Sequence, residues 1–146
     1  MAKFEISTVI NRPLEEVFAV MSNTENILKW QSGTIEAEKT SDGPIGVGTT
    51  GRSVSRFLGR RIESESEFTE YELNRKFVFK SKSGPIQFEV RMTFERVEGG
   101  TRINTKFEAE IGGFFKLAEP LVVSMGKRQL EGDLANLKDL MEAHAL

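Results

Sequence analysis

The strongest constraint on this fold is an alternation of apolar and polar residues along two neighbouring segments, residues 86–96 and 101–111. In both segments almost every second residue is apolar, with Thr101 and Thr105 as the exceptions on the second. A period of two is typical of strands that have one covered face and one face in water. Only Glu98-Gly99-Gly100 and its neighbours separate the segments, so they predict an antiparallel hairpin.

The same period predicts five further strands, at residues 3–10, 35–40, 49–57, 60–71 and 76–83. Gly, Pro, Asp and Ser residues separate the later ones, and the short connections favour antiparallel pairing. Two short helices are expected after the first strand. One begins near Pro13, and the other follows a capping box formed by Ser22 and Glu25 and ends near Trp30.

After Gly112-Gly113 a long helix is expected to about Ala143, with an apolar stripe formed by Leu130, Leu134, Leu137 and Met141. The element order predicts one α+β domain over residues 1–146. A curved antiparallel sheet of about seven strands would wrap around the C-terminal helix, with two short helices after the first strand. One helix is too small to fill such a sheet, so a cavity is expected between them.

The long helix carries two unusual features. Its stripe, extended backward, passes through Gly126, where a large residue would normally pack. Either a close backbone approach or room for a ligand explains this glycine. Pro120 is a candidate kink. Three apolar residues lie on the opposite face and form either a pocket mouth or a protein contact, such as a homodimer: Leu117, Leu121 and Met125.

Composition narrows the function classes. The net charge of −2 makes nucleic acid an unexpected partner. The absence of cysteine excludes disulfides, thiolate zinc sites and cysteine nucleophiles. His144, the single histidine, lies two residues from the chain end and is not expected to be catalytic. We expect no metal, no cofactor and no integral membrane association. With no secretory signal at the N-terminus, a cytoplasmic location is expected.

Two motifs have more than one interpretation. Residues 46–51 match the Gly-x-Gly-x-x-Gly nucleotide pattern, but a strand-like segment follows where a helix is required, so a hairpin loop is predicted. Glu63, Glu65 and Glu67 share one strand face, as carboxylates for acid–base work or cation binding would. Ile62 and Phe68 have the opposite parity, so these glutamates are expected in solvent, opposite Arg or Lys.

Inward-facing positions supply the candidate ligand site, and no catalytic residue is assigned. Ser64, Ser66 and Thr105 fall on the apolar face, either to orient a polar group of a ligand or to bond to water and backbone. Trp30 either caps the pocket mouth or packs in the core. The predicted ligand-binding residues are Trp30, Phe57, Ser64, Ser66, Phe77, Phe79, Phe88, Val90, Met92, Thr105, Phe107, Phe115, Val122, Val123 and Gly126.

Several short segments, in their order and spacing, carry a resemblance to a known family over nearly the whole chain. They are Asn11-Arg12-Pro13, Glu16-Val17-Phe18, Trp30, Gly46-Val47-Gly48-Thr49, Leu58-Gly59-Arg60-Arg61, residues 68–72 and residues 134–138. The chain resembles the START-related helix-grip superfamily, in particular its polyketide cyclase/dehydrase and lipid-transport branch. The resemblance implies an apolar ligand held between the sheet and the last helix.

The leading hypothesis is therefore a protein that binds a small apolar or amphipathic ligand, such as a lipid or a polyketide-like compound. Two alternatives stay open. One is a cyclase or dehydratase acting on such a ligand, which a buried carboxylate or tyrosine in the cavity would favour. The other is a protein-interaction module that works through the exposed apolar face of the long helix.

Overall fold

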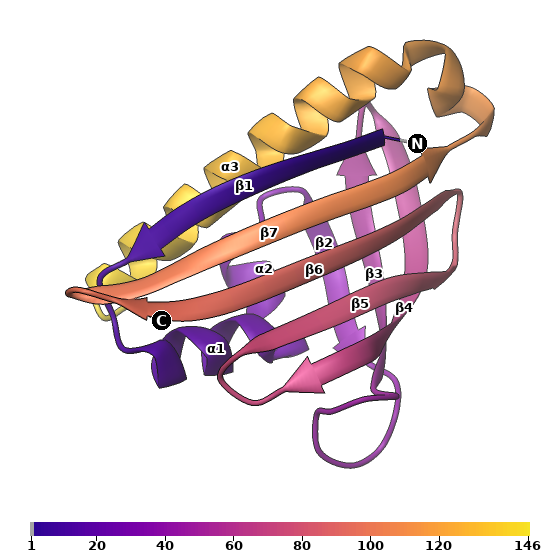
Figure 1. Ribbon diagram of the computed structural model, residues 1–146. Helices are drawn as coiled ribbons and strands as arrows, with labels where there is room; N and C mark the ends of the chain where they lie inside the picture. The colour runs from indigo at the N-terminus through magenta and orange to yellow at the C-terminus, as the bar shows by residue number, and fades with distance from the viewer. Residues whose placement is uncertain (1) are drawn as a thin grey trace.

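The computed structural model describes residues 2–146, and for residues 113–115 it describes the backbone without the side chains. One antiparallel sheet has the strand order β1-β7-β6-β5-β4-β3-β2 (Figure 1). Its strands are β1 (Ala2–Ile10), β2 (Thr34–Lys39), β3 (Thr50–Phe57), β4 (Arg60–Glu72), β5 (Lys76–Ser83), β6 (Ile86–Val97) and β7 (Gly100–Ile111). The helices are α1 (Leu14–Ser22), η1 (Thr24–Asn26), α2 (Ile27–Trp30), η2 (Gly113–Ala118) and α3 (Glu119–Glu142).

The strand pairing follows the alternation in the sequence. Val90 of β6 lies opposite Phe107 of β7, both on the covered face. The β3–β4 connection is a two-residue turn in which Leu58 and Gly59 have φ angles of 51° and 74°. Two consecutive positive φ angles match the right-handed twist of a hairpin, so this turn keeps β3 and β4 in register.

The short helices form where the sequence predicts them, with a different cap on the second. Pro13 immediately precedes α1, and the buried residues Val17 and Phe18 face the sheet. The expected cap, Ser22, is instead the last residue of α1. Asn23 caps η1, because its side-chain oxygen accepts a hydrogen bond from the backbone N–H of Glu25 at 3.1 Å.

The long helix begins later than the sequence analysis placed it. Residues 113–118 form the 3-10 helix η2, and α3 starts at Glu119 with Pro120 in its first turn. Proline is tolerated there because the first N–H groups of a helix have no intrahelical acceptor. Pro120 therefore marks a helix start and not the candidate kink.

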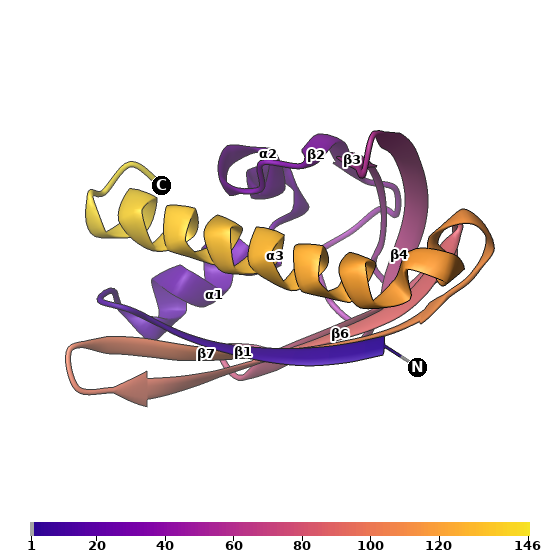
Figure 2. The same ribbon diagram turned by 90° about the horizontal axis from the view of Figure 1, so that it is seen from above.

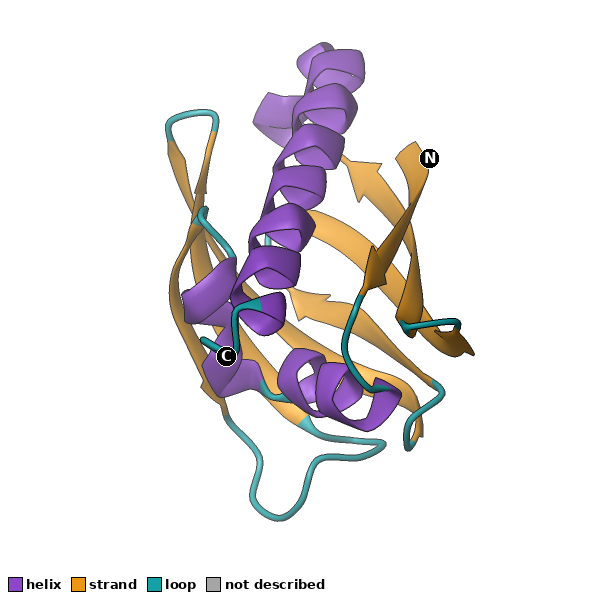
Figure 3. Cartoon of the chain, turned by 90° about the vertical axis from the view of Figure 1, so that its left-hand side faces the viewer, coloured by secondary structure: helices purple, strands orange, loops and turns teal. Residues whose placement is uncertain are grey.

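The sheet curves around α3 (Figure 2). The helix runs along the open side of the curve, with β1 on one side and α2 on the other (Figure 3). The main core, which includes Phe18, Ile103, Leu134 and Leu137, packs under the C-terminal half of α3. A smaller apolar cluster around Ala109, Ile111 and Val122 packs near its beginning.

Candidate functional site

A cavity of about 380 Å³ lies between the concave face of the sheet and α3. Its wall takes residues from both apolar clusters, including Phe77 from the main core and Val122 from the smaller one. Space remains because the inward positions of β3 and of the facing part of β4 are largely small. Ser53 lies opposite Ser64, and Gly51 lies opposite Ser66. Leucine or phenylalanine at these positions would occupy the space that serine and glycine leave.

One wall of the cavity is a belt of phenylalanine rings that crosses five adjacent strands. Phe4 of β1 stacks on Phe107 of β7 with ring centroids 4.8 Å apart, and Phe107 lies 6.3 Å from Phe88 of β6. Phe79 of β5 lies 6.2 Å from Phe88 and 6.1 Å from Phe68 of β4. All five residues line the cavity. The belt offers a continuous apolar surface on which a flat or aliphatic ligand can pack.

The facing wall, on β3 and β4, carries hydroxyl groups. The side-chain oxygens of Ser53 and Ser64 lie 3.3 Å apart, and Ser55 and Ser66 line the cavity beside them. Serine hydroxyls both donate and accept hydrogen bonds. The cavity is therefore amphipathic, with an aromatic wall and a hydroxyl-bearing wall.

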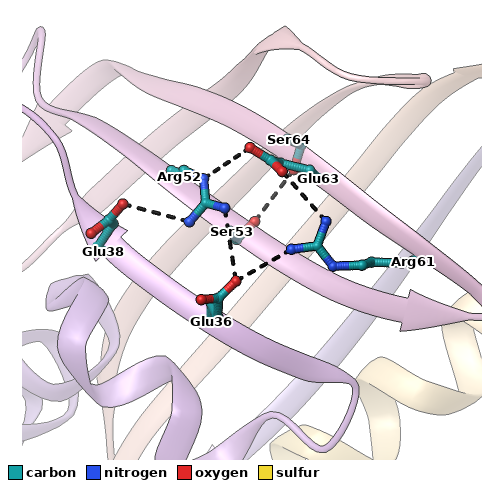
Figure 4. A network of polar contacts seen from close by, with 7 residues as sticks. All are labelled: Glu36, Glu38, Arg52, Ser53, Arg61, Glu63 and Ser64. Carbon is teal, nitrogen blue, oxygen red and sulfur yellow. Dashed lines mark hydrogen bonds and ion pairs between the residues drawn. The ribbon is translucent and has the colours of Figure 1, made fainter.

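The opposite face of the same strands holds a network of charged side chains (Figure 4). Arg52 Nε donates to Glu63 Oε1 at 2.9 Å, and its guanidinium also pairs with Glu36 and Glu38. The hydrogen bond from Arg52 lowers the pKa of the Glu63 carboxyl, and the same bond raises the pKa of Arg52. Glu63 lies on the solvated face beside Arg partners, as predicted from the parity of Ile62.

Polar groups also gather at one end of the cavity, where α3 meets the segment between α2 and β2. Asp133 is 6% exposed and lines the cavity. Its Oδ1 accepts hydrogen bonds from the backbone N–H of Ser32 at 3.0 Å and from the Ser32 hydroxyl at 2.9 Å. Gln129 lies one turn earlier and packs so closely on Gly33 that a Cβ there would fall 1.9 Å from its Nε2. Gln31 lines the same end of the cavity.

Most of the predicted ligand-binding residues line the cavity. They are Phe57, Ser64, Ser66, Phe77, Phe79, Phe88, Val90, Met92, Phe107, Val122, Val123 and Gly126. Trp30 is 2% exposed and packs in the main core, outside the cavity wall. Thr105 faces inward but is fully buried between Ile6 and Met92, also outside the wall. Phe115 lies outside the side chains that the structure describes. Ligand binding by all these residues stays a prediction.

The sequence analysis missed the polar end of the cavity, although signals for it were present. Asp133 lies three residues after Leu130 and four before Leu137, inside the apolar stripe of the long helix. An acidic residue at such a position points inward by helical spacing alone. Ser53 and Ser55 share the parity of Phe57, which was assigned to the pocket.

The remaining motifs have clear places. Residues 46–49 lie in the loop between β2 and β3, and Gly48 has a φ of 90°, so the nucleotide-like pattern leads into a strand. Leu117, Leu121 and Met125 are 98%, 55% and 38% exposed.

Within residues 2–146, no helix is long and apolar enough to cross a bilayer, and no group of His, Asp or Glu side chains is arranged to hold a metal ion.

Comparison with known proteins identifies the family. The family model for polyketide cyclase / dehydrase and lipid transport proteins matches residues 1–142. This chain belongs to that family. No curated protein sequence matches the chain.

Three solved structures illustrate the shared fold. TTHA0849 from Thermus thermophilus is 20% identical, with a TM-score of 0.85 and 99% of each chain covered. A START superfamily protein from Mycobacterium smegmatis is 13% identical, with a TM-score of 0.80 and coverage of 98% of this chain and 99% of that one. The Zhui aromatase/cyclase from Streptomyces is 12% identical, with a TM-score of 0.79 and coverage of 99% and 95%. These matches confirm the α+β helix-grip architecture of the family.

Proposed function

We propose that this protein binds a small apolar or amphipathic ligand, of lipid or polyketide-like chemistry, in the cavity between the sheet and α3. The observation that carries the proposal is the phenylalanine belt, which faces about 380 Å³ of space. Ligand pockets commonly measure about 300–1,000 Å³ and have mostly apolar walls with a few polar groups. The description of the family, which includes lipid transport, supports the same function.

The expected affinity is micromolar. Removing roughly 300 Å² of apolar ligand surface from water contributes about 7 kcal/mol. Lost translational and rotational freedom and the desolvation of polar groups offset much of this gain. A dissociation constant of about 1 µM corresponds to about −8 kcal/mol, so the apolar wall surface that the ligand covers and hydrogen bonds to the polar wall must more than offset that cost.

Two measurements test the proposal. Mass spectrometry of an organic extract of the purified protein should find an apolar or amphipathic compound in stoichiometric amount. After removal of that compound, N-phenyl-1-naphthylamine should bind saturably, with the rise in fluorescence that accompanies transfer to an apolar site. An empty extract together with no saturable probe binding would contradict the proposal.

Asp133 supports an enzyme as the second candidate function. It is a buried carboxylate in the wall of the cavity, which is the feature that a cyclase or dehydratase needs for proton transfer. The description of the family and the Zhui aromatase/cyclase structure are in line with this alternative. The test is whether the compound that co-purifies, or a β-polyketone analogue of it, is converted by the protein and not by the Asp133→Asn variant.

A homodimer is proposed for the exposed apolar face that Leu117 of η2 forms with Leu121 and Met125 of α3. Burying these side chains against a second copy would remove apolar surface from water. Sedimentation velocity of the parent protein and of the Leu121→Lys variant tests this contact. A dimeric parent and a monomeric variant are expected if the contact forms, whereas a monomeric parent at high concentration would exclude it.

A further inference from the structure

The carboxylate of Asp133 is unusual in its surroundings. Asp side chains are rarely so deeply buried unless a cation or several hydrogen bonds compensate for the lost water. Both hydrogen bonds from Ser32 reach the same oxygen, Oδ1. Among the described residues, no hydrogen bond reaches Oδ2, and no ion pair joins Asp133 to a Lys, Arg or His side chain.

The basic residues in the cavity wall do not change this picture. Arg52 forms ion pairs with Glu36, Glu38 and Glu63 on the outer face of the sheet. Arg56 is exposed and lies four residues further along β3, so it shares the outward parity of Arg52. Among the described side chains, the acceptor at the Asp133 end of the cavity therefore has no positively charged partner.

The polar neighbours of Asp133 come from three elements and surround the same end of the cavity. Gln31 follows α2, Thr34 begins β2, and Gln129 lies on α3. The hydroxyl of Thr34 donates to Oε1 of Gln31 at 2.9 Å, so that donor is already used. At this end the cavity wall thus includes a carboxylate with an unused acceptor, Oδ2 of Asp133, while the phenylalanine belt provides the surface for an apolar body.

We propose that the cavity selects amphipathic ligands whose polar end carries a hydrogen-bond donor, an ammonium or hydroxyl group, and that Oδ2 of Asp133 accepts this donor. The inference rests on the proposed binding function and specifies its ligand class. Ser32 is a positioning residue, because its two hydrogen bonds to Oδ1 hold the carboxylate with Oδ2 directed away from that contact. A carboxylate or phosphate head group is disfavoured at this end, because it would bring a second negative charge to Asp133.

Three ligands with the same apolar chain test the proposal: decylamine, 1-decanol and decanoate, each competing with bound N-phenyl-1-naphthylamine at pH 7. The amine is then protonated and the acid is ionised. Decylamine is expected to bind about tenfold more tightly than decanoate, the size of one hydrogen bond to a charged group. Decanol should fall between them.

Asp133→Asn retains the shape of the side chain and removes its charge, so the preference for decylamine over decanoate should fall at least fivefold. Glu131→Gln is the matched control, because it removes a carboxylate charge from the exposed side of the same helix, outside the cavity wall, and it should keep the preference. Thermal unfolding checks that both variants are folded. If Asp133→Asn does not fold, the ligand order on the parent protein decides alone.

The outcomes separate this inference from the proposed function. Equal binding of all three ligands, tighter binding of decanoate, or an unchanged order in Asp133→Asn would overturn the role of Asp133 and leave the proposed function in place. No displacement by any of the three, from a protein that also fails to bind the probe, would contradict both.

Discussion

The side-chain oxygens of Ser53 and Ser64 lie 3.3 Å apart at directly opposite positions of β3 and β4, on the concave face of the sheet. Ala37 of β2 lies on the other side of Ser53. Three small residues in a row across neighbouring strands leave space under α3, whereas the strands on the far side of the sheet fill theirs with phenylalanine. The cavity thus results from the unequal size of the residues on the two halves of the concave face.

Filling that space should remove ligand binding at little cost in stability. We expect Ser53→Leu to weaken binding of N-phenyl-1-naphthylamine at least tenfold. The free energy of unfolding should change by less than about 1 kcal/mol, because the added atoms enter open space and not a packed core. Fluorescence titration and urea unfolding measure the two effects.

Glu65→Leu is the control for this substitution, because Glu65 is exposed and lies on the outer face opposite Arg52. It adds a leucine to the same pair of strands without entering the cavity, and it should bind the probe as the parent does. A Ser53→Leu protein that loses more than about 2 kcal/mol yet keeps full probe binding would show that the site is elsewhere.

The sequence predicts most of this fold because the signals that define it are local. The alternation along β6 and β7 and the turns at Leu58-Gly59 and Gly99-Gly100 determine pairing between neighbours in the chain. The predicted start of α3 was wrong. Gly112-Gly113 marks the end of β7, and the 3-10 turns that follow it have no distinct periodic pattern. Proline at position 120 then fits a helix start as well as it fits a kink.

The glycine loop between β2 and β3 offers a stability test. Gly48 has a φ of 90°, which a residue with a Cβ adopts at a cost of about 1–2 kcal/mol. We therefore expect Gly48→Ala to lower the free energy of unfolding by about that amount, measured by urea unfolding. Gly46→Ala is the matched control, because Gly46 does not have a positive φ and a Cβ there meets open space.

The same pair of variants tests the nucleotide-like pattern. Neither the parent nor either variant should bind NADH or NADPH saturably, because β3 follows the loop where a dinucleotide site requires a helix N-terminus. Micromolar binding that Gly48→Ala abolishes would contradict the hairpin interpretation.

Prediction of the site was less complete because it depends on contacts between distant segments. Parity assigned Phe88, Phe107 and Ser64 to the inner face, since strand geometry is enough for that. The contact of Asp133 with Ser32 joins residues 101 positions apart, and no local pattern indicates it. Trp30 was placed in the site by its position at the end of the second short helix and Thr105 by its parity, and the structure buries both side chains outside the cavity wall.

Low pH should weaken the contact between α3 and the segment that follows β1. The Glu142 carboxylate accepts hydrogen bonds from Lys138 and from the backbone N–H of Asn11, and these lower its pKa below the ordinary value. A carboxyl whose pKa is lower in the folded state stabilises the protein above its unfolded-state pKa. That contribution is lost as pH falls, because the unfolded chain takes up the proton first.

Urea unfolding between pH 7 and pH 3 measures this effect. Glu142→Gln should be less stable than the parent at pH 7, and the difference should shrink as pH falls below about 4.5. Glu131→Gln, on the exposed side of the same helix, should follow the parent throughout. A constant difference between Glu142→Gln and the parent across this range would show that the carboxylate contributes through packing and not through charge.

Gly126 provides the most direct separation of a cavity from a packed core. It lines the cavity, and a Cβ built on it meets no atom within 4 Å. Glycine is about 1 kcal/mol less favourable than alanine inside a helix, and leucine is close to alanine. Gly126→Leu should therefore unfold at or above the parent temperature, while its side chain occupies the cavity and prevents binding of N-phenyl-1-naphthylamine.

Gly132→Leu is the matched control: Gly132 is exposed on the same helix, outside the cavity wall, and a Cβ there also meets open space. It should gain the same helix stability and keep probe binding. If both variants melt higher and both bind the probe, the ligand does not enter under α3. If Gly126→Leu melts several degrees lower while Gly132→Leu does not, α3 is packed against the sheet at that point and the binding hypothesis is wrong.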